Sequence, residues 1–289
     1  VAPVDNAGDY LESTRNSLVS QSLAPGELEI LLVDDASADG SLAVCEQYAR
    51  RHRNIRVFSL PERSPGGCGF PCNMGIKKAR GRYVGFLDCD DLAAPTMFEE
   101  LLRAAEDAGA DMAFCSFTNS WGDETEAPPS DIHYWTCLFD KDFQALSEAA
   151  QKSMFLKTAP PAWRKLYRRD FLQKNNLLFP VGDYFFEDNT FHWTTIIKAG
   201  KITALDRSLA THRQRAGQTT GMDACEAALH IAGQMRLILR FLNAERLTGE
   251  YREAFMHLAG DTLSRIAEDH PRFRGIQDVM ADICAFQHL

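Results

Sequence analysis

The sequence predicts an α/β fold: a Rossmann-like, mostly parallel sheet with helices on both faces, followed by a C-terminal helical segment. Two observations predict it. Short apolar runs alternate with helical spacing over the first 118 residues, whereas residues 224–286 show helical spacing alone. Such alternation is typical of parallel strands joined by right-handed crossovers. The 289 residues, of which 45% are hydrophobic and 25% charged, suffice for one large or two ordinary globular domains.

The individual elements follow from apolar spacing and from residues that begin or end helices. We expect buried strands at residues 29–33, 55–58, 83–87, 111–117 and 202–205. We expect helices at residues 42–49, 73–79, 95–108, 139–155, 189–199 and 224–286. Residues 65–71 hold too many glycines and prolines for either regular state. Residues 122–130 predict a surface loop or an inserted hairpin, and residues 212–220 a polar loop.

Composition excludes several classes of protein. Because 31 Lys and Arg face 40 Asp and Glu, the formal net charge is −9, and we expect no nucleic-acid partner. No apolar run approaches the roughly 18 residues of a membrane span. The first residues lack the basic and apolar regions of a signal peptide, and the eight cysteines lie mostly in apolar segments. We therefore expect a cytoplasmic protein with reduced thiols.

Acidic residues follow two of the predicted strands. Asp34 and Asp35 end the first apolar run, and Asp88, Asp90 and Asp91 end the third. In an open parallel sheet, ligands bind beyond the carboxyl ends of the strands. Carboxylates gathered there repel one another unless a cation or ligand donors satisfy them, and Mg²⁺ or Mn²⁺ suits such oxygens. The alternative is that these aspartates only cap helices and form turns.

Two other motifs fit the same residues less well. Residues 35–46 match the spacing of an EF-hand calcium loop, but a strand rather than a helix is predicted before them. Residues 88–92 are similar to the nucleophile loop of haloacid-dehalogenase-like phosphatases, but Leu92 stands where that loop has a hydroxyl or Val, and the loop normally follows the first strand.

An ordered set of sequence blocks resembles family 2 glycosyltransferases of the GT-A fold. The first blocks are Pro3–Asn6, Leu11, Ser17–Leu18, Gln21, Glu29–Val33, Asp34–Ser41, Asn73–Ile76, Ala79–Gly81 and Phe86–Asp91. Later blocks are similar to the second half of bacterial members: Lys165–Arg169, Phe179–Pro180, Phe186–Asp188 and His212–Arg213. The resemblance covers residues 1–215, which would form the catalytic domain, with a nucleotide-binding part at 1–118 and an acceptor part at 119–215. Residues 216–289 would form a helical extension.

The resemblance implies roles for the residues of the donor site. Asp35 would bind the nucleotide base, with Pro3 and Asn6 beside it. Asp88 would contact the ribose or the metal shell, with Asp91 in the same donor site.

The resemblance also implies a metal site and a catalytic base. Asp90 and His212 would ligate a divalent cation, Mn²⁺ or Mg²⁺, that bridges the two phosphates of the donor. Asp188 would be the general base, with Glu187 beside it, so that single displacement inverts the anomeric carbon. The alternatives are a helix N-cap for Asp188 and a hydrogen-bonded surface histidine for His212.

We therefore expect a metal-dependent inverting glycosyltransferase that moves a sugar from a UDP-sugar to a glycan or lipid-linked acceptor in bacterial surface polysaccharide synthesis. It would lie in the cytoplasm, including the inner face of the membrane, and could form a homodimer through its C-terminal helices. The alternatives are a nucleotidyltransferase, although residues 9–15 lack that class's basic glycine-rich loop, and a non-catalytic sugar-nucleotide-binding module.

Some residues depart from the family pattern or have open roles. Family members usually have Tyr at the position of Asp5 and Arg at that of Cys72, and a full hydrophobic strand before Pro3. Cys68 and Cys72 have the spacing of a chelating pair but lack further ligands, so we expect ordinary thiols. Residues 163–169 could bind an anionic acceptor or form a solvated helix face, and Arg213 or Arg215 could reach the diphosphate.

Overall fold

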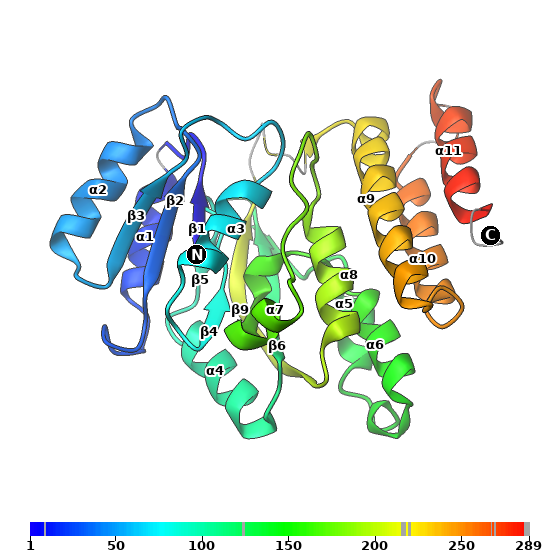
Figure 1. Ribbon diagram of the computed structural model, residues 1–289, viewed down its shortest axis with the longest axis horizontal. Coiled ribbons are helices and arrows are strands. Elements are labelled where there is room, and N and C mark those ends of the chain that lie inside the picture. The colour runs from blue at the N-terminus through cyan, green and yellow to red at the C-terminus, as the bar shows by residue number, and fades with distance from the viewer. Residues whose placement is uncertain are drawn as a thin grey trace. The chain divides into compact units, whose positions relative to one another are not determined.

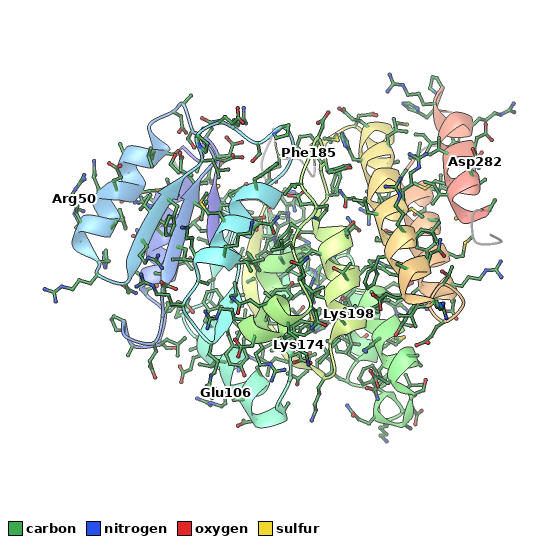
Figure 2. All side chains as sticks on the ribbon, viewed as in Figure 1. Arg50, Glu106, Lys174, Phe185, Lys198 and Asp282 are labelled. Carbon is green, nitrogen blue, oxygen red and sulfur yellow. The ribbon has the colours of Figure 1, made fainter. Side chains whose placement is uncertain are left out.

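The computed structural model describes residues 1–8, 10–122, 125–214, 218, 221–266, 268 and 270–285. They fall into two compact units (Figure 1). The first unit consists of residues 1–129, 161–183 and 198–214, and the second of residues 130–160, 184–197 and 215–289. Charged side chains such as Arg50 and Glu106 project into solvent (Figure 2).

A parallel three-stranded sheet begins the first unit. Its strands are β1 (Ala2–Val4), β2 (Ile30–Asp34) and β3 (Ile55–Ser59), paired in the order β1-β2-β3. Helices α1 (Tyr10–Val19) and α2 (Ser41–Arg51) connect them. All five residues of β2 are buried, which explains its continuous apolar run. The prediction of parallel strands joined by helices is confirmed here.

A second, mixed sheet of six strands completes the first unit. Its strands are β4 (Tyr83–Gly85), β5 (Leu92–Ala93), β6 (Met112–Ser120), β7 (Glu126–Ala127), β8 (Lys165–Arg168) and β9 (Ile202–Arg213). The order is β4-β8-β6-β9-β5, and β7 pairs with β6 as the inserted hairpin that the sequence offered as one alternative. Among its hydrogen-bonded pairs in the described part of the chain, only β6–β9 is parallel: β4, β6 and β9 run in one direction, and β5, β7 and β8 run in the other.

The two sheets meet at the first residue. The amino group of Val1 donates to the carbonyl of Gly85 at 2.8 Å, and the amide of Leu87 donates to the carbonyl of Val1 at 3.0 Å. This is the hydrogen-bond pattern of parallel neighbours, so β1 and β4 run in the same direction. The loops that follow β1, β2 and β4 therefore leave the same edge of the sheets.

Helices cover the strands of the first unit. Helix α3 (Gly69–Lys78) packs on β1 and β2, and α4 (Met97–Ala108) packs on β6, β8 and β9. A 3₁₀ turn (Ala162–Arg164) precedes β8, and α7 (Arg169–Lys174) follows it. The prediction that residues 65–71 are irregular is wrong for the last three, because α3 starts at Gly69. Pro71 fits there, since the first turn of a helix does not need its N–H.

A cavity of about 290 Å³ also lies in the first unit. Apolar residues line it, among them Val1, Ile30, Phe86 and Leu166. It adjoins the start of β2, at the end of that strand opposite to Asp34 and Asp35. The cavity is therefore separate from the edge at which the acidic residues gather.

The described part of the second unit is helical. Its α-helices are α5 (Ile132–Cys137), α6 (Glu148–Leu156), α8 (Asp188–Lys198), α9 (Ala224–Glu245), α10 (Arg252–Ser264) and α11 (Phe273–Ala285), with a 3₁₀ turn at Phe143–Ala145. Figure 1 shows α9, α10 and α11 side by side. The helix predicted at residues 139–155 forms only as the 3₁₀ turn and α6. No helix among the described residues combines the length and apolar character that a bilayer crossing requires.

Candidate active site

Three carboxylates converge in the loop that follows β4. Asp88, Asp90 and Asp91 each offer an oxygen, and these oxygens all lie within 4.8 Å of one another. Asp91 is completely buried, whereas the other two are half-buried. The acidic loop (residues 88–91) thus forms a group of oxygen ligands of the kind that hard divalent cations prefer.

His212 is connected to this group through Asp91. Its Nδ1 lies 3.1 Å from Oδ1 of Asp91, and its ring stacks on Trp163 at a centroid distance of 5.5 Å. Burial lowers the pKa of His212, but the hydrogen bond and charge of Asp91, together with the charge of Asp90, outweigh burial and raise that pKa. For Asp91, an acid, burial acts in the other direction and raises the pKa. His212 is the penultimate residue of strand β9, so the prediction of a polar loop starting at this position is wrong.

Arg213 holds the acidic loop against α1. Its Nε donates to the carbonyl of Asp90, its Nη1 to Ser13 Oγ at 2.6 Å and its Nη2 to Thr14 Oγ1 at 2.8 Å. Thr14 in turn donates to the carbonyl of Cys89 at 2.9 Å, and the amide of Arg213 donates to Asp91 at 2.9 Å. We name these contacts the Arg213 latch. The contacts of the Arg213 guanidinium are with the acidic loop and α1, so they do not support the expected role at the diphosphate. Arg215, the other candidate for that role, lies outside the described residues.

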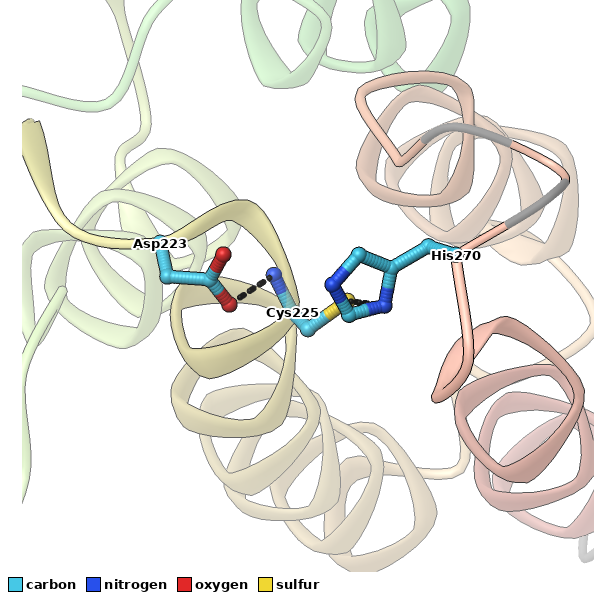
Figure 3. Close-up of side chains that lie close together, drawn as sticks. All are labelled: Asp223, Cys225 and His270. Atoms are coloured by element: carbon cyan, nitrogen blue, oxygen red, sulfur yellow. Dashed lines mark hydrogen bonds between the residues drawn. The ribbon is translucent and has the colours of Figure 1, made fainter.

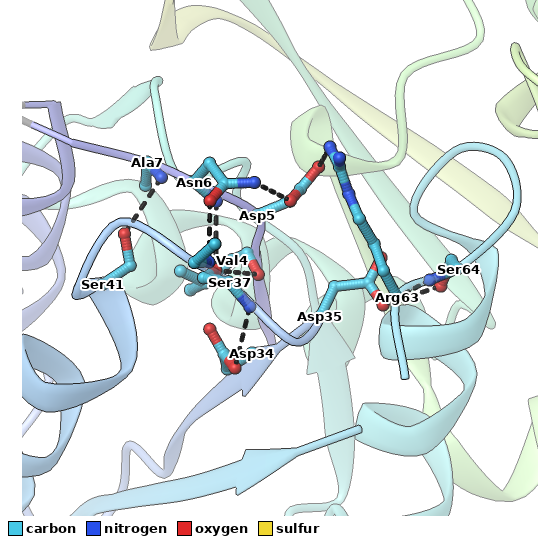
Figure 4. A network of polar contacts seen from close by, with 11 residues as sticks. Val4, Asp5, Asn6, Ala7, Asp34, Asp35, Ser37, Ser41, Arg63 and Ser64 are labelled. Carbon is cyan, nitrogen blue, oxygen red and sulfur yellow. Dashed lines mark hydrogen bonds and ion pairs between the residues drawn. The ribbon is translucent and has the colours of Figure 1, made fainter. Parts of the chain in front are cut away.

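Asp35 lies at the end of β2 with one oxygen already bonded (Figure 4). Its Oδ1 accepts from the amide of Ser64 at 2.9 Å and from the hydroxyl of Ser64 at 2.8 Å. The side chain is 4% exposed, and burial raises its pKa. Its Oδ2 makes no hydrogen bond within the described part of the chain. Asp35 therefore offers a single acceptor to a ligand.

The loop after β1 is tied to the loop after β2 (Figure 4). The backbone amide of Asn6 donates to Ser37 Oγ at 3.0 Å, and its side-chain Oδ1 accepts from the backbone amide of Ala38 at 2.9 Å. Asp5 pairs with Arg63 at 2.6 Å, beside Asp35. Asn6 (φ 44°) and Ala36 (φ 54°) both have left-handed backbones, which often occur where a loop is shaped for function.

Asp34 has the turn role that the sequence offered as the alternative, and Asp39, which follows it in the same loop, has a similar role. Oδ2 of Asp34 accepts from the amide of Ser37 at 3.3 Å. Oδ1 of Asp39 accepts from the amide of Ser41 at 3.0 Å, at the start of α2, and Oδ2 accepts from the amide of Gly8 at 3.0 Å. The first strand to end in aspartates therefore contributes Asp35 alone to the candidate site. A strand, β2, precedes these residues, in contrast to the helix of an EF-hand.

Glu187 and Asp188 lie in the second unit. Asp188 is the first residue of α8, and Glu187 before it is 5% exposed. The residue before them, Phe186, has a left-handed backbone (φ 59°). A hydrogen bond of 2.6 Å from Thr190 to Gln234 joins α8 to α9. The general-base role expected of Asp188 stays a prediction, because the acidic loop belongs to the first unit.

The basic stretch at residues 163–169 is mostly buried, so both sequence-based interpretations of it are wrong. Arg164 and Lys165 are completely buried, and only Arg168 is clearly exposed, where it pairs with Asp111. Arg164 donates from Nε to the carbonyl of Cys115 at 2.8 Å. These two buried cations pack within the second sheet. They form neither a surface for an anionic acceptor nor a solvated helix face.

Sequence reasoning missed the contacts that position the site. Ser64, Arg63 and Thr14 carry no motif of their own. Ser64 and Arg63 follow β3, so the rule that ligands bind beyond the carboxyl ends of strands could have pointed to them. The pairing of His212 with Asp91 joins residues 121 positions apart, which no local pattern indicates. The described cysteines, including Cys68 and Cys72, are free thiols, as expected.

Comparison with known proteins identifies the family. The model of "Glycosyl transferase family 2" matches residues 1–210. The uncharacterized glycosyltransferase EpsJ of Bacillus subtilis is 30% identical over 254 residues, which are 88% of this chain and 72% of EpsJ. YibD of Escherichia coli is 29% identical over 68% of this chain and 54% of its own length. The chain thus spans about half of some of its relatives.

Solved structures share the fold. Staphylococcus aureus TarS 1–349 in complex with UDP-GlcNAc has a TM-score of 0.65 at 20% identity and covers 99% of this chain and 88% of its own. The mannosyltransferase PcManGT from Pyrobaculum calidifontis, in complex with GDP-Man and Mn²⁺, has a TM-score of 0.61 at 16% identity, covering 99% and 85%. The GT-A fold is therefore confirmed, and with the family match it follows that this chain belongs to glycosyl transferase family 2.

Proposed function

We propose that this glycosyltransferase moves a sugar from a UDP-sugar to an acceptor hydroxyl with inversion, in the synthesis of a bacterial surface glycan. One observation carries the proposal: the carboxylates of Asp88, Asp90 and Asp91 converge beyond β4, on the same sheet edge as Asp35 beyond β2. This arrangement supports the binding of a cation and of a nucleotide base on one side of one unit. Relatives include the poly(ribitol-phosphate) β-N-acetylglucosaminyltransferase TarS of Staphylococcus aureus, 29% identical over 75% of this chain.

The environment of Asp35 favours uracil over guanine. Because Ser64 occupies Oδ1, only Oδ2 can accept from the base. Uracil presents one ring N–H on its pairing edge, whereas guanine presents a ring N–H and an amino group that together need both carboxylate oxygens. Leaving the guanine amino group unpaired would cost about 1–3 kcal/mol. Asp35 therefore supports a UDP-sugar as the donor, with Pro3 and Asn6 in the adjoining loop.

The residues present fit a divalent cation. Three carboxylates supply oxygen atoms, and burial of Asp91 makes the group costly to keep without positive charge nearby. Asp90 and His212 would hold the ion, with Asp88 in its shell, while Asp91 orients His212 through its Nδ1. A divalent cation bound there would neutralise the departing diphosphate. Oxygen-rich ligation is suited to Mg²⁺ or Mn²⁺.

Asp188 is proposed as the base that accepts the proton of the acceptor hydroxyl. It begins α8 directly after the left-handed Phe186 and the buried Glu187, and the Thr190–Gln234 hydrogen bond anchors this helix to α9. A carboxylate on the face of the sugar opposite to the leaving group gives one displacement and one inversion. Glu187, buried beside it, would help to fix the approach of the chain to the helix.

Replacing Asp188 by Asn tests the catalytic role. The amide keeps the shape of the carboxylate but cannot take a proton, so we expect turnover of UDP-sugar and acceptor to fall about 10²–10⁴-fold while calorimetry finds unchanged donor affinity. Asp170→Asn, in the first turn of α7 and exposed, is the matched control and should leave both unchanged. Persisting turnover in Asp188→Asn would exclude Asp188 as the base.

Calorimetry with UDP-, GDP- and dTDP-sugars, with and without Mn²⁺, tests the donor and the metal. We expect Mn²⁺-dependent binding of UDP-sugars and its loss in Asp90→Asn. Tight binding without turnover of any acceptor would instead favour a non-catalytic sugar-nucleotide-binding module. Release of pyrophosphate would favour a nucleotidyltransferase. A glycan or lipid-linked acceptor, location in the cytoplasm or at the inner face of the membrane, and dimerisation through residues 216–289 are further parts of the proposal.

A further inference from the structure

A second group of metal-binding side chains lies in the helical unit, outside the candidate active site. Asp223 is the N-cap of α9, Cys225 is the second residue of that helix, and His270 precedes α11. Each offers one ligand atom, and these atoms all lie within 4.8 Å of one another. Figure 3 shows the imidazole of His270 facing the sulfur of Cys225, with Sγ and Nδ1 2.9 Å apart.

The hydrogen bonds define the protonation of this cluster. The backbone amide of Arg272 donates to Nδ1 of His270 at 3.2 Å, so Nδ1 carries a lone pair rather than a proton. The contact from Cys225 is therefore S–H donating to the same nitrogen. Cys225 is completely buried, so water does not compete for its sulfur. A thiol proton thus occupies the space between a sulfur and a nitrogen that both bind soft metal ions.

The start of α9 places the ligands at the positive end of a 22-residue helix, which acts in favour of a thiolate and a carboxylate. In the metal-free chain burial outweighs this effect and raises the pKa of the Cys225 thiol, in agreement with the S–H donor described above. Oδ1 of Asp223 accepts from the amides of Cys225 and Glu226 at 3.0 and 3.2 Å, which orients the carboxylate and leaves Oδ2 for another partner. Thiolate, carboxylate and neutral imidazole together balance the charge of a divalent cation.

We propose that Asp223, Cys225 and His270 bind a zinc ion that joins the start of α9 to the turn before α11. The three ligands are a sulfur, a nitrogen and an oxygen of the types that zinc takes in tetrahedral sites, and water would complete the set. On binding, the thiol proton between Cys225 and His270 is released to solvent and the amide of Arg272 gives up its hydrogen bond to Nδ1, so that the lone pair of this nitrogen turns to the cation. The acidic loop is the opposite case, because oxygen atoms alone favour Mg²⁺ or Mn²⁺. This inference does not depend on the proposed transferase reaction.

The full chain, freed of metal with a chelator, is titrated with Co²⁺ and then with Zn²⁺. Thiolate bound to Co²⁺ gives a charge-transfer absorption in the near ultraviolet, which carboxylates cannot give. We expect this absorption at one equivalent and its loss when Zn²⁺ displaces Co²⁺. It should be absent in Cys225→Ser, and in His270→Gln the Co²⁺ concentration at half-saturation should rise at least about tenfold. The Zn²⁺-induced rise in the unfolding temperature should also disappear in His270→Gln.

The matched control removes one thiol from each of two other places that could bind the probe. Cys68 and Cys72 lie 3.6 Å apart, and Cys89 lies in the acidic loop, so the double variant Cys68→Ser/Cys89→Ser must keep the absorption. Absorption that survives in Cys225→Ser, or that is missing from the unaltered chain, would overturn the proposal. If Cys225→Ser does not fold, His270→Gln decides, because His270 is only partly buried and lies in a turn.

Discussion

The Arg213 latch predicts that a conservative substitution outside the acidic loop will impair catalysis. Arg213→Lys keeps the positive charge but replaces a forked guanidinium by a single ammonium. In the structure the fork reaches the carbonyl of Asp90, Ser13 Oγ and Thr14 Oγ1 at once. One nitrogen cannot serve all three acceptors, so we expect the lysine to keep one of these hydrogen bonds and to leave the other two unmade.

The expected size of the effect follows from the two unmade hydrogen bonds. A hydrogen bond from a charged donor contributes about 1.5–3 kcal/mol. Because the guanidinium is only partly buried, we take the lower value for each of the two, which amounts to about 3 kcal/mol. At about 1.4 kcal/mol for each factor of ten, the equilibrium constant for holding the acidic loop in place falls roughly 100-fold. We expect kcat/KM for the donor to fall by up to that factor, with weaker Mn²⁺ activation.

The assay is steady-state transfer from UDP-sugar over a series of Mn²⁺ concentrations, with thermal unfolding measured in parallel. Arg207→Lys is the matched control on the same strand, because Arg207 is exposed and only approaches Glu100, at 3.4 Å. That variant should stay within about twofold of the unaltered enzyme. If Arg213→Lys responds normally to Mn²⁺ and its kcat/KM stays close to that of Arg207→Lys, the latch does not position the acidic loop.

Two further predictions concern stability. Burial acts to raise the pKa of Asp39, but hydrogen bonds from Ser41 and Gly8 outweigh it and lower that pKa. The ionised Asp39 therefore stabilises the folded state above the unfolded pKa of about 3.9, and this contribution to the free energy of unfolding is lost as the pH falls through the folded pKa. Asp39→Asn should therefore flatten the loss of thermal stability below about pH 4, measured by calorimetry from about pH 6 to about pH 3, and an unchanged pH profile would contradict the assignment. Trp193→Ala empties a site that is 1% exposed and should lower the free energy of unfolding by about 3–5 kcal/mol in denaturant titration, whereas Trp121→Ala, 48% exposed, should change it by less than about 0.5 kcal/mol.

The strands that carry the site could be predicted because their burial is continuous. Ile30–Asp34 is buried at every position, and so is most of Met112–Ser120, which gives the apolar runs their signal. Strand β8 could not be predicted, because it begins with a buried lysine after a buried arginine. Lys165 lies 5.1 Å from the ring of Phe114, and Arg164 bonds a main-chain carbonyl. Partners distant in the sequence thus make charges acceptable where a local pattern predicts exposure.

The candidate site could be predicted as a set of residues but not as a set of contacts. The clustering of aspartates after two strands is a local signal, and strand direction brings Asp35 and Asp90 to one edge. Their separate functions depend on partners from elsewhere in the chain. Ser64 leaves Asp35 with one acceptor, and Arg213 holds the loop that contains Asp90. Such pairings arise from the tertiary fold, so the spacing of residues along the sequence does not predict them.

The departure at Asp5 illustrates how one such pairing can alter a pocket. Asp5 accepts from Arg63 at 2.6 Å and from Asn6 at 2.7 Å, and the side chains of Asp5 and Arg63 are 40% and 61% exposed. An ion pair this exposed contributes at most about 1 kcal/mol to the free energy of unfolding, so it does little to stabilise the fold. We expect its effect to be geometric instead, because the pair holds a flat guanidinium near Asp35, where its planar face could stack on a nucleotide base. At the sequence position where the family pattern has a tyrosine, this chain therefore has a carboxylate that pairs with a planar cation.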